Sequence, residues 1–330
     1  MTTLVRTRRH HQALKLSLPP PIPASKFQTP MYSKTLSPAA SLGSPVIKNL
    51  FELEKIAVLG HGNGGTVYKV FHKGTSSIYA LKVLRFNDDS DRVWQQATRE
   101  AEILKLVDSP FVIRCNSAFY NNGLAVGSDE PGGADLSFVM EYMEGGSLQD
   151  LLVSRKTLLE KEISEVAGCV LLGFRYLHDM QIVHGDIKPS NLLVNGEGKV
   201  KIADFGVSHV VDGGGVARHL LLESCMGTCA YMSPERFDPE RWGGGGDGFA
   251  GDVWSLGVVA LECHMGRFPL TRAGQRPDWA TLMCIMCFRE RVEVPETASP
   301  EFRSFVERCL EKDWRKRATV DELLEHPFVN

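Results

Sequence analysis

Two short polar segments, His184–Asn191 and Asp204–Gly206, set the tightest requirement on the fold of this chain. The first holds an Asp, a Lys and an Asn within one loop, and the second brings another Asp. The first Asp can accept a hydroxyl proton while the other groups face phosphate and metal, and phosphoryl transfer depends mostly on such positioning and charge neutralisation. We therefore predict that Asp186 and Lys188 are catalytic and that Asn191 and Asp204 hold Mg²⁺.

A glycine-rich segment lies far upstream of these residues and has the spacing GxGxxGxV. Glycines let a backbone approach phosphates closely. Alone the pattern is weak, because a glycine-rich hairpin turn looks similar. In this order along the chain it predicts ATP contacts by Leu59, Gly60, His61, Gly62, Asn63, Gly64, Gly65, Thr66 and Val67.

The next predicted ATP ligand is Lys82, at the end of the strand-like run Tyr79–Lys82. Without the glycine-rich segment upstream, an ordinary solvated lysine would be the better interpretation. A helical pattern of apolar residues follows, at Ala97, Ala101, Leu104 and Val107. We expect Glu100 on this helix to pair with Lys82, with Glu102 as the alternative partner.

The order of these motifs, closed by Ser233–Glu235, resembles that of protein kinases. The resemblance implies an α+β bilobal fold, with a small, mostly antiparallel β lobe over residues 51–140 and a large helical lobe over 141–330. The apolar run Phe138–Met143 then enters the connector between the lobes, where Glu141 and Met143 would contact ATP. Enough chain follows the N-terminal segment to form two separate cores.

Longer strings narrow the resemblance to the plant mitogen-activated protein (MAP) kinase kinases of the short, group D type. These strings are Gly227–Phe237, Gly251–Gly257 and Gly274–Leu282. The resemblance implies a dual-specificity enzyme that uses ATP and Mg²⁺ to phosphorylate Thr and Tyr of a MAP kinase, under an upstream kinase. It also implies that Asp252 braces the catalytic loop and that Arg317 pairs with Glu235.

Two departures from the family pattern concern regulation. Gly185 stands where most kinases have an Arg that binds a phosphorylated activation segment. Of the two expected phosphorylation sites in that segment, only Ser224 is present, because Arg218 occupies the first position. We therefore expect weakened or altered control by an upstream kinase. A weakly active or inactive nucleotide-binding scaffold that docks a MAP kinase is the alternative, and a Ser/Thr kinase outside the cascade is another.

The first 50 residues are basic and rich in Pro and Ser, and we interpret them as a disordered tail. They carry a formal charge of +7, so the remainder of the chain, whose total is −3, carries −10. Basic residues followed by alternating apolar ones suit an extended peptide that docks a MAP kinase, and the candidate docking residues are Arg8, Arg9, Leu14 and Leu16. An organelle transit peptide and a plain solvated tail are the other interpretations.

Composition limits which metal sites, cellular locations and membrane segments are expected. The eight cysteines show no paired zinc-binding spacing, and the CxxC at Cys284–Cys287 is more typical of buried thiols than of a metal site. Reduced cysteines suit the cytoplasm or nucleus. The apolar run Val253–Ala260 is too short to span a bilayer and predicts a core helix. We expect neither nucleic-acid nor membrane partners.

Overall fold

A computed structural model describes residues 47–62, 65–85, 91–121, 135–211, 229–242, 248–271, 279–288 and 292–330. These residues all belong to one compact unit, Pro45–Asn330. Ile47, which precedes the predicted domain start at residue 51, is buried in the core of the small lobe. Its carbonyl accepts a hydrogen bond from Ser117 Oγ at 3.0 Å. The boundary between tail and domain stays a prediction, because residues 1–46 lie outside the described part of the chain.

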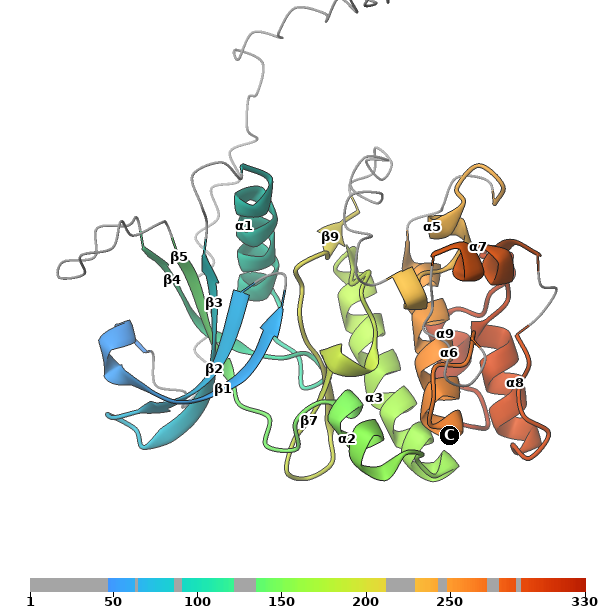
Figure 1. Ribbon diagram of the computed structural model, residues 1–330, viewed down its shortest axis with the longest axis horizontal. Helices are drawn as coiled ribbons and strands as arrows, with labels where there is room; N and C mark the ends of the chain where they lie inside the picture. The colour runs from blue at the N-terminus through green and yellow to red at the C-terminus, as the bar shows by residue number, and fades with distance from the viewer. Residues whose placement is uncertain are drawn as a thin grey trace, which may run out of the picture. The chain divides into compact units, whose positions relative to one another are not determined.

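The small lobe is an antiparallel sheet of five strands in the order β1-β2-β3-β5-β4, with one helix beside it, as expected (Figure 1). Its elements are β1 (Leu53–Gly62), β2 (Gly65–His72), β3 (Ser77–Arg85), α1 (Asp91–Leu106), β4 (Cys115–Asn121) and β5 (Asp135–Glu141). Successive side chains of a strand point to opposite faces. Leu81 and Val139 accordingly join a small cluster around Ile47, while Leu84 and Phe138 pack on the opposite side with α1.

Helix α1 is amphipathic and buries the predicted face. Ala97, Ala101 and Leu104 are buried in the core, and Val107 directly after the helix continues the same stripe. Residues three and four apart lie on one side of a helix. The same geometry turns Glu100 inward, where it is buried, and leaves Glu102 exposed.

The large lobe is mainly helical. Its helices are α2 (Leu148–Arg155), α3 (Glu160–Asp179), α5 (Pro234–Phe237), α6 (Phe249–Met265), α7 (Trp279–Phe288), α8 (Pro300–Cys309) and α9 (Val320–Leu324). Helix α6 is buried on all sides from Gly251 to Cys263 and packs against α3 and α8. The predicted core helix at Val253–Ala260 is therefore present. No helix among the described residues is long and apolar enough to cross a membrane.

Two short antiparallel ladders in the large lobe hold the polar segments. Strand β6 (Ile182–Val183) pairs with β9 (His209–Val210), and β7 (Leu192–Val194) pairs with β8 (Val200–Ile202). The catalytic loop, His184–Asn191, connects β6 to β7, and Asp204 is the second residue after β8. Pairing therefore places the ends of both segments side by side.

The CxxC prediction needs a correction. Cys284 lies on α7 as expected, but its side chain is exposed rather than buried. Helix α7 is apolar through most of its length, so the sequence pattern does not tell which side faces the core. No cluster of metal-binding side chains of the His, Cys, Asp and Glu types occurs in the described ranges.

Candidate active site

Lys82 contacts two carboxylates, and the contact with Asp204 joins the two lobes. Its Nζ lies 2.7 Å from Glu100 Oε1 on α1 and 2.8 Å from Asp204 Oδ1 after β8. Strand β3 supplies the lysine in register with Phe138 of β5, so its position is set by the centre of the sheet. Helix α1 also contacts the second segment directly, because Gln96 donates a hydrogen bond to the carbonyl of Gly206. The structure brings together the lysine, glutamate and aspartate that the sequence pattern selected.

Electrostatics keeps this lysine charged. Burial alone would lower the pKa of Lys82, but the carboxylates of Asp204 and Glu100 together raise it above its ordinary value. Loss of water would raise the pKa of Asp204, yet the Lys82 ammonium holds it below its usual range. Burial raises the pKa of Glu100 in spite of the same cation. A permanent positive charge beside Asp204 suits the binding of phosphate groups.

Asp186 is held through one oxygen of its carboxylate and leaves the other open. Its Oδ2 accepts hydrogen bonds from Lys188 Nζ at 2.8 Å and Asn191 Nδ2 at 3.0 Å. Asn191 Nδ2 also donates to the backbone carbonyl of Asp186 at 2.8 Å. Asp186 Oδ1 is buried and has no hydrogen-bond partner in the described part of the chain. This oxygen is free to accept a proton from a hydroxyl group brought to the site.

The backbone of the catalytic loop is fixed from below by Asp252 of α6. Asp252 Oδ2 accepts from the His184 amide at 2.9 Å, and Oδ1 accepts from the Gly185 amide at 2.8 Å. His178 contacts the same carboxylate at 3.1 Å. Burial alone would raise the pKa of Asp252, but these hydrogen bonds and the two histidines lower it. The bracing role that the resemblance implied therefore has its geometry here.

The glycine-rich segment forms the facing ends of β1 and β2. Val67 is paired with Lys82 across the sheet, so the segment leads directly to the lysine. At Gly65 the backbone has a φ of +128°, and an added Cβ would lie 2.1 Å from the carbonyl oxygen of Val83. His61 Nδ1 and Thr66 Oγ1 lie 3.2 Å apart, and Leu59 is exposed. Gly65 is thus required by the sheet itself.

The two predicted connector residues, Glu141 and Met143, differ in which of their groups could still contact a nucleotide. The Glu141 carboxylate is bound by Lys201 Nζ at 2.7 and 2.8 Å and by the Arg114 amide at 2.7 Å. Met143 is buried in the core. A contact between Glu141 and ATP would therefore use its backbone, because its side chain is already engaged.

The residues around Asp186 and Lys82 fit a metal–nucleotide ligand. The amide nitrogen of Asn191 is engaged by Asp186, and its Oδ1, which accepts a long hydrogen bond of 3.4 Å from Ser190 Oγ, is the atom that would bind a cation. Together with the Asp204 carboxylate this makes a set of hard oxygen donors, the type that Mg²⁺ prefers. Lys82 supplies the complementary positive charge for phosphate.

Some predicted site residues lie outside the described residues. These are Asn63 and Gly64 of the glycine-rich segment, the candidate phosphorylation site Ser224, and the tail residues Arg8, Arg9, Leu14 and Leu16. Their roles stay predictions.

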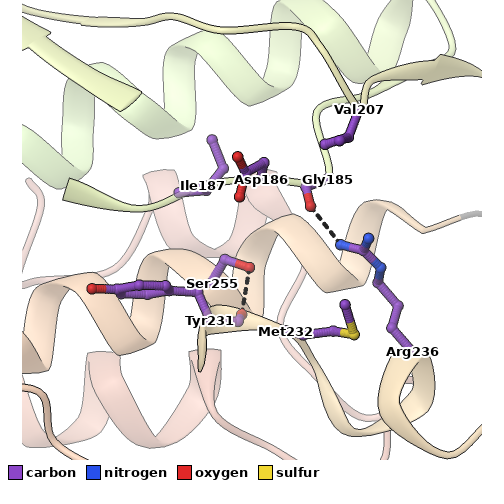
Figure 2. A pocket seen from close by; sticks show the side chains of 8 residues that line it. All are labelled: Gly185, Asp186, Ile187, Val207, Tyr231, Met232, Arg236 and Ser255. Atoms are coloured by element: carbon purple, nitrogen blue, oxygen red, sulfur yellow. Dashed lines mark hydrogen bonds between the residues drawn. The ribbon is translucent and has the colours of Figure 1, made fainter. Parts of the chain in front are cut away.

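Two residues at the site were not predicted from the sequence. Lys201 binds the connector glutamate, and Arg236 donates from Nη1 to the carbonyl of Gly185 at 2.6 Å. Figure 2 shows Arg236 reaching the catalytic loop across a pocket that Asp186, Tyr231 and other side chains line. Both contacts join residues far apart in the chain, and a local motif carries no signal for such pairs.

Three features of this site together define the class of the protein kinases. They are a lysine paired with a helix glutamate, an aspartate on a braced loop, and a second aspartate from the other lobe. The protein kinase domain family matches residues 53–329. The chain is accordingly an ATP-dependent protein kinase.

Individual relatives place the chain within a narrower family of protein kinases. The chain is 52% identical to mitogen-activated protein kinase kinase 10 of Arabidopsis thaliana over 328 residues, covering 99% of both chains. It is 49% identical to kinase kinase 9 and 46% identical to kinase kinase 7 of the same plant, each over 99% of this chain and 98% of the relative. The chain belongs to the mitogen-activated protein kinase kinases of plants.

Proposed function

We propose that this kinase transfers the γ-phosphoryl group of ATP to the Thr and Tyr of a MAP kinase activation loop. The observation that supports the proposal most directly is the Oδ1 of Asp186, which is buried and has no hydrogen-bond partner among the described residues. The names of the relatives, which are kinases of MAP kinase, support the choice of substrate. The catalytic aspartate, the lysine beside it and both metal-ligand candidates are all present. The substitution at Gly185 leaves each of them in place.

In the proposed reaction only one carboxylate oxygen of Asp186 acts as the base. Asp186 Oδ1 accepts the proton of the substrate hydroxyl as that hydroxyl oxygen forms a bond to the γ-phosphorus and the bond to the bridging oxygen of ADP breaks. Lys188, held at 2.8 Å on Oδ2, keeps a positive charge beside the transferred group. Lys82 orients the α- and β-phosphates, and Glu100 fixes the lysine.

Mg²⁺ is the metal that we propose for the site. It would neutralise charge on the β- and γ-phosphates when bound, and Asn191 and Asp204 would hold it. Oxygen-only donors argue for a hard cation rather than zinc.

The sequence supports proposals for the partners and the location of the protein. We propose that Arg8, Arg9, Leu14 and Leu16 dock the MAP kinase, since a tethered substrate has a raised effective concentration. Ser224 is the proposed target of an upstream kinase. The free cysteines suit a cytoplasmic or nuclear protein.

The test is phosphorylation of an inactive plant MAP kinase by the full-length protein, read separately at Thr and Tyr by mass spectrometry. Wild type is compared with Asp186→Ala, with Ser224→Ala and with a tail variant, Arg8→Ala/Arg9→Ala. Each is assayed with Mg²⁺, Mn²⁺ or Ca²⁺. We expect dual phosphorylation with Mg²⁺, lost in Asp186→Ala. The tail variant should raise KM for the MAP kinase without changing KM for ATP.

Three outcomes would contradict parts of the proposal. Transfer to Ser or Thr of a general substrate, without the MAP kinase Tyr, would indicate a kinase outside the cascade. Binding of the MAP kinase without transfer would indicate a scaffold. Full activity of Asp186→Ala would refute the assignment of the base.

A further inference from the structure

The starting observation is the backbone of Gly185, next to the catalytic Asp186. Its φ is +78°, in the left-handed region that glycine adopts without cost. A glycine at this position has no side chain to restrict it, so the peptide that carries Asp186 depends on its neighbours for orientation. The question is which groups hold it.

Both sides of Gly185 are held by charged side chains. Its amide donates to Asp252 Oδ1 at 2.8 Å, and its carbonyl accepts from Arg236 Nη1 at 2.6 Å. The carbonyl belongs to the peptide that leads into Asp186, so Arg236 sets the direction in which Asp186 leaves the backbone. A hydrogen bond from a charged donor is stronger than a neutral one.

The guanidinium of Arg236 also lies in contact with the position where a side chain at residue 185 would begin. A Cβ built on Gly185 would lie 3.7 Å from Arg236 Nη1 and 3.8 Å from Nη2. Arg236 and Asp186 line the same pocket (Figure 2). Residue 185 itself provides no cation. The guanidinium of Arg236, from the segment that follows the activation segment, provides one beside it.

Arg236 stands on a rigid base. It belongs to the short helix α5, directly after Glu235, and Glu235 forms a two-point ion pair with Arg317 at 2.7 and 2.9 Å. The stem of Arg236 passes close to the backbone of Gly251 in α6, where an added Cβ would lie at an ordinary contact distance of 3.5 Å from Arg236 Cδ. A long side chain anchored in this way loses less conformational entropy when it binds the loop.

We infer that Arg236 is a positioning residue for Asp186: its guanidinium takes the place of the missing catalytic-loop arginine and orders the loop without a phosphorylated activation segment. The inference deepens the proposed kinase function and rests on it for its kinetic consequence. Its structural consequence, an ordered loop, can be measured without turnover.

The experiment compares wild type with Arg236→Gln, Arg236→Lys and the control Arg241→Gln, an exposed arginine on the same segment. Hydrogen exchange of the peptide that spans residues 182–191 is followed by mass spectrometry. We expect about 10-fold faster exchange in Arg236→Gln, as for the loss of a charged hydrogen bond. Arg236→Lys, which keeps the charge, should lie between, and Arg241→Gln should match wild type.

Kinetics supply the second measurement. Arg236→Gln should lower kcat about 10-fold with an unchanged KM for ATP, because the base and not the nucleotide site is disturbed. Unchanged exchange in Arg236→Gln at an unchanged Tm would overturn the inference. So would equal exchange in the Gln and Lys variants, which would indicate packing alone. A wild type without kinase activity would refute the proposed function and leave the exchange result as the separate test of the loop.

Discussion

Two backbone positions of the catalytic region have a positive φ. Asp204 has a φ of +67° and Gly185 a φ of +78°. An L-residue in this region is strained by about 1–2 kcal/mol, and Asp tolerates it better than most. Asp204 accepts the strain at the point where its carboxylate meets Lys82. At residue 185 the chain avoids the strain by using glycine.

Gly185→Ala tests this strain separately from crowding, since among the described residues other than its chain neighbours no atom lies closer than 3.7 Å to the added Cβ. We expect the free energy of unfolding to fall by about 1 kcal/mol because of the left-handed backbone. Thermal or urea unfolding measures it. Gly168→Ala is the matched control: Gly168 lies inside α3, and Ala there should stabilise the helix by about 0.5–1 kcal/mol. Equal effects of the two substitutions would contradict the explanation.

At the scale of elements, the hairpin of β1 and β2 combines two demands. The turn end of the hairpin must approach a nucleotide, and β2 must pack onto β3 from its first residue. Gly60 serves the first, because an added Cβ would meet no atom of the described residues within 4 Å. Gly65 serves the second, at 2.1 Å from the carbonyl oxygen of Val83. The glycine motif therefore contains residues with different physical reasons.

These two glycines should differ on substitution. Gly65→Ala forces the backbone of β2 away from β3 and should lower the free energy of unfolding by about 2 kcal/mol or more. Gly60→Ala should change stability by less than about 0.5 kcal/mol and raise KM for ATP. Thermal unfolding and ATP titration separate the two effects. A stability loss of the same size at Gly60 would show that the hairpin, and not the contact with Val83, is limiting.

At the scale of the whole domain, a buried ion pair ties the end of the activation segment to the C-terminal region. Arg317 contacts Glu235 through two hydrogen bonds and the Ala250 carbonyl through another at 2.6 Å. Its guanidinium also lies 5.1 Å from the centre of the Trp254 ring. Glu235 and Arg317 are both almost fully buried. The pair therefore joins α5, α6 and the segment before α9.

Breaking this pair should affect the whole molecule. Arg317→Met leaves Glu235 charged in the interior and should cost about 3–5 kcal/mol. The double variant Glu235→Leu/Arg317→Met should recover part of that loss, since no lone charge remains. The exposed pair Arg155–Glu162 has similar geometry, and Arg155→Met should cost less than about 1 kcal/mol. Urea unfolding compares them. Equal costs at both pairs would contradict the role of burial.

Much of the architecture follows from local patterns. The strand-like run Tyr79–Lys82, the stripe of α1 and the apolar run of α6 each predicted their elements, because residues that are neighbours in sequence carry the local apolar pattern. The kinase fold and the family membership agree with the expectation from the motifs. The exposure of Cys284 was not predicted, since α7 is apolar through most of its length and has no distinctive face.

By itself, the sequence determined the class of the protein, because the spacing within each motif already fixes which functional groups share a loop or strand. Tertiary structure decided the pairings between motifs. Glu100 rather than Glu102 reaches Lys82 because α1 turns that side of the helix inward. Lys201 and Arg236 meet the connector and the catalytic loop only because packing brings distant segments together. Contacts of this kind depend on three-dimensional packing, and no local pattern in the chain specifies them.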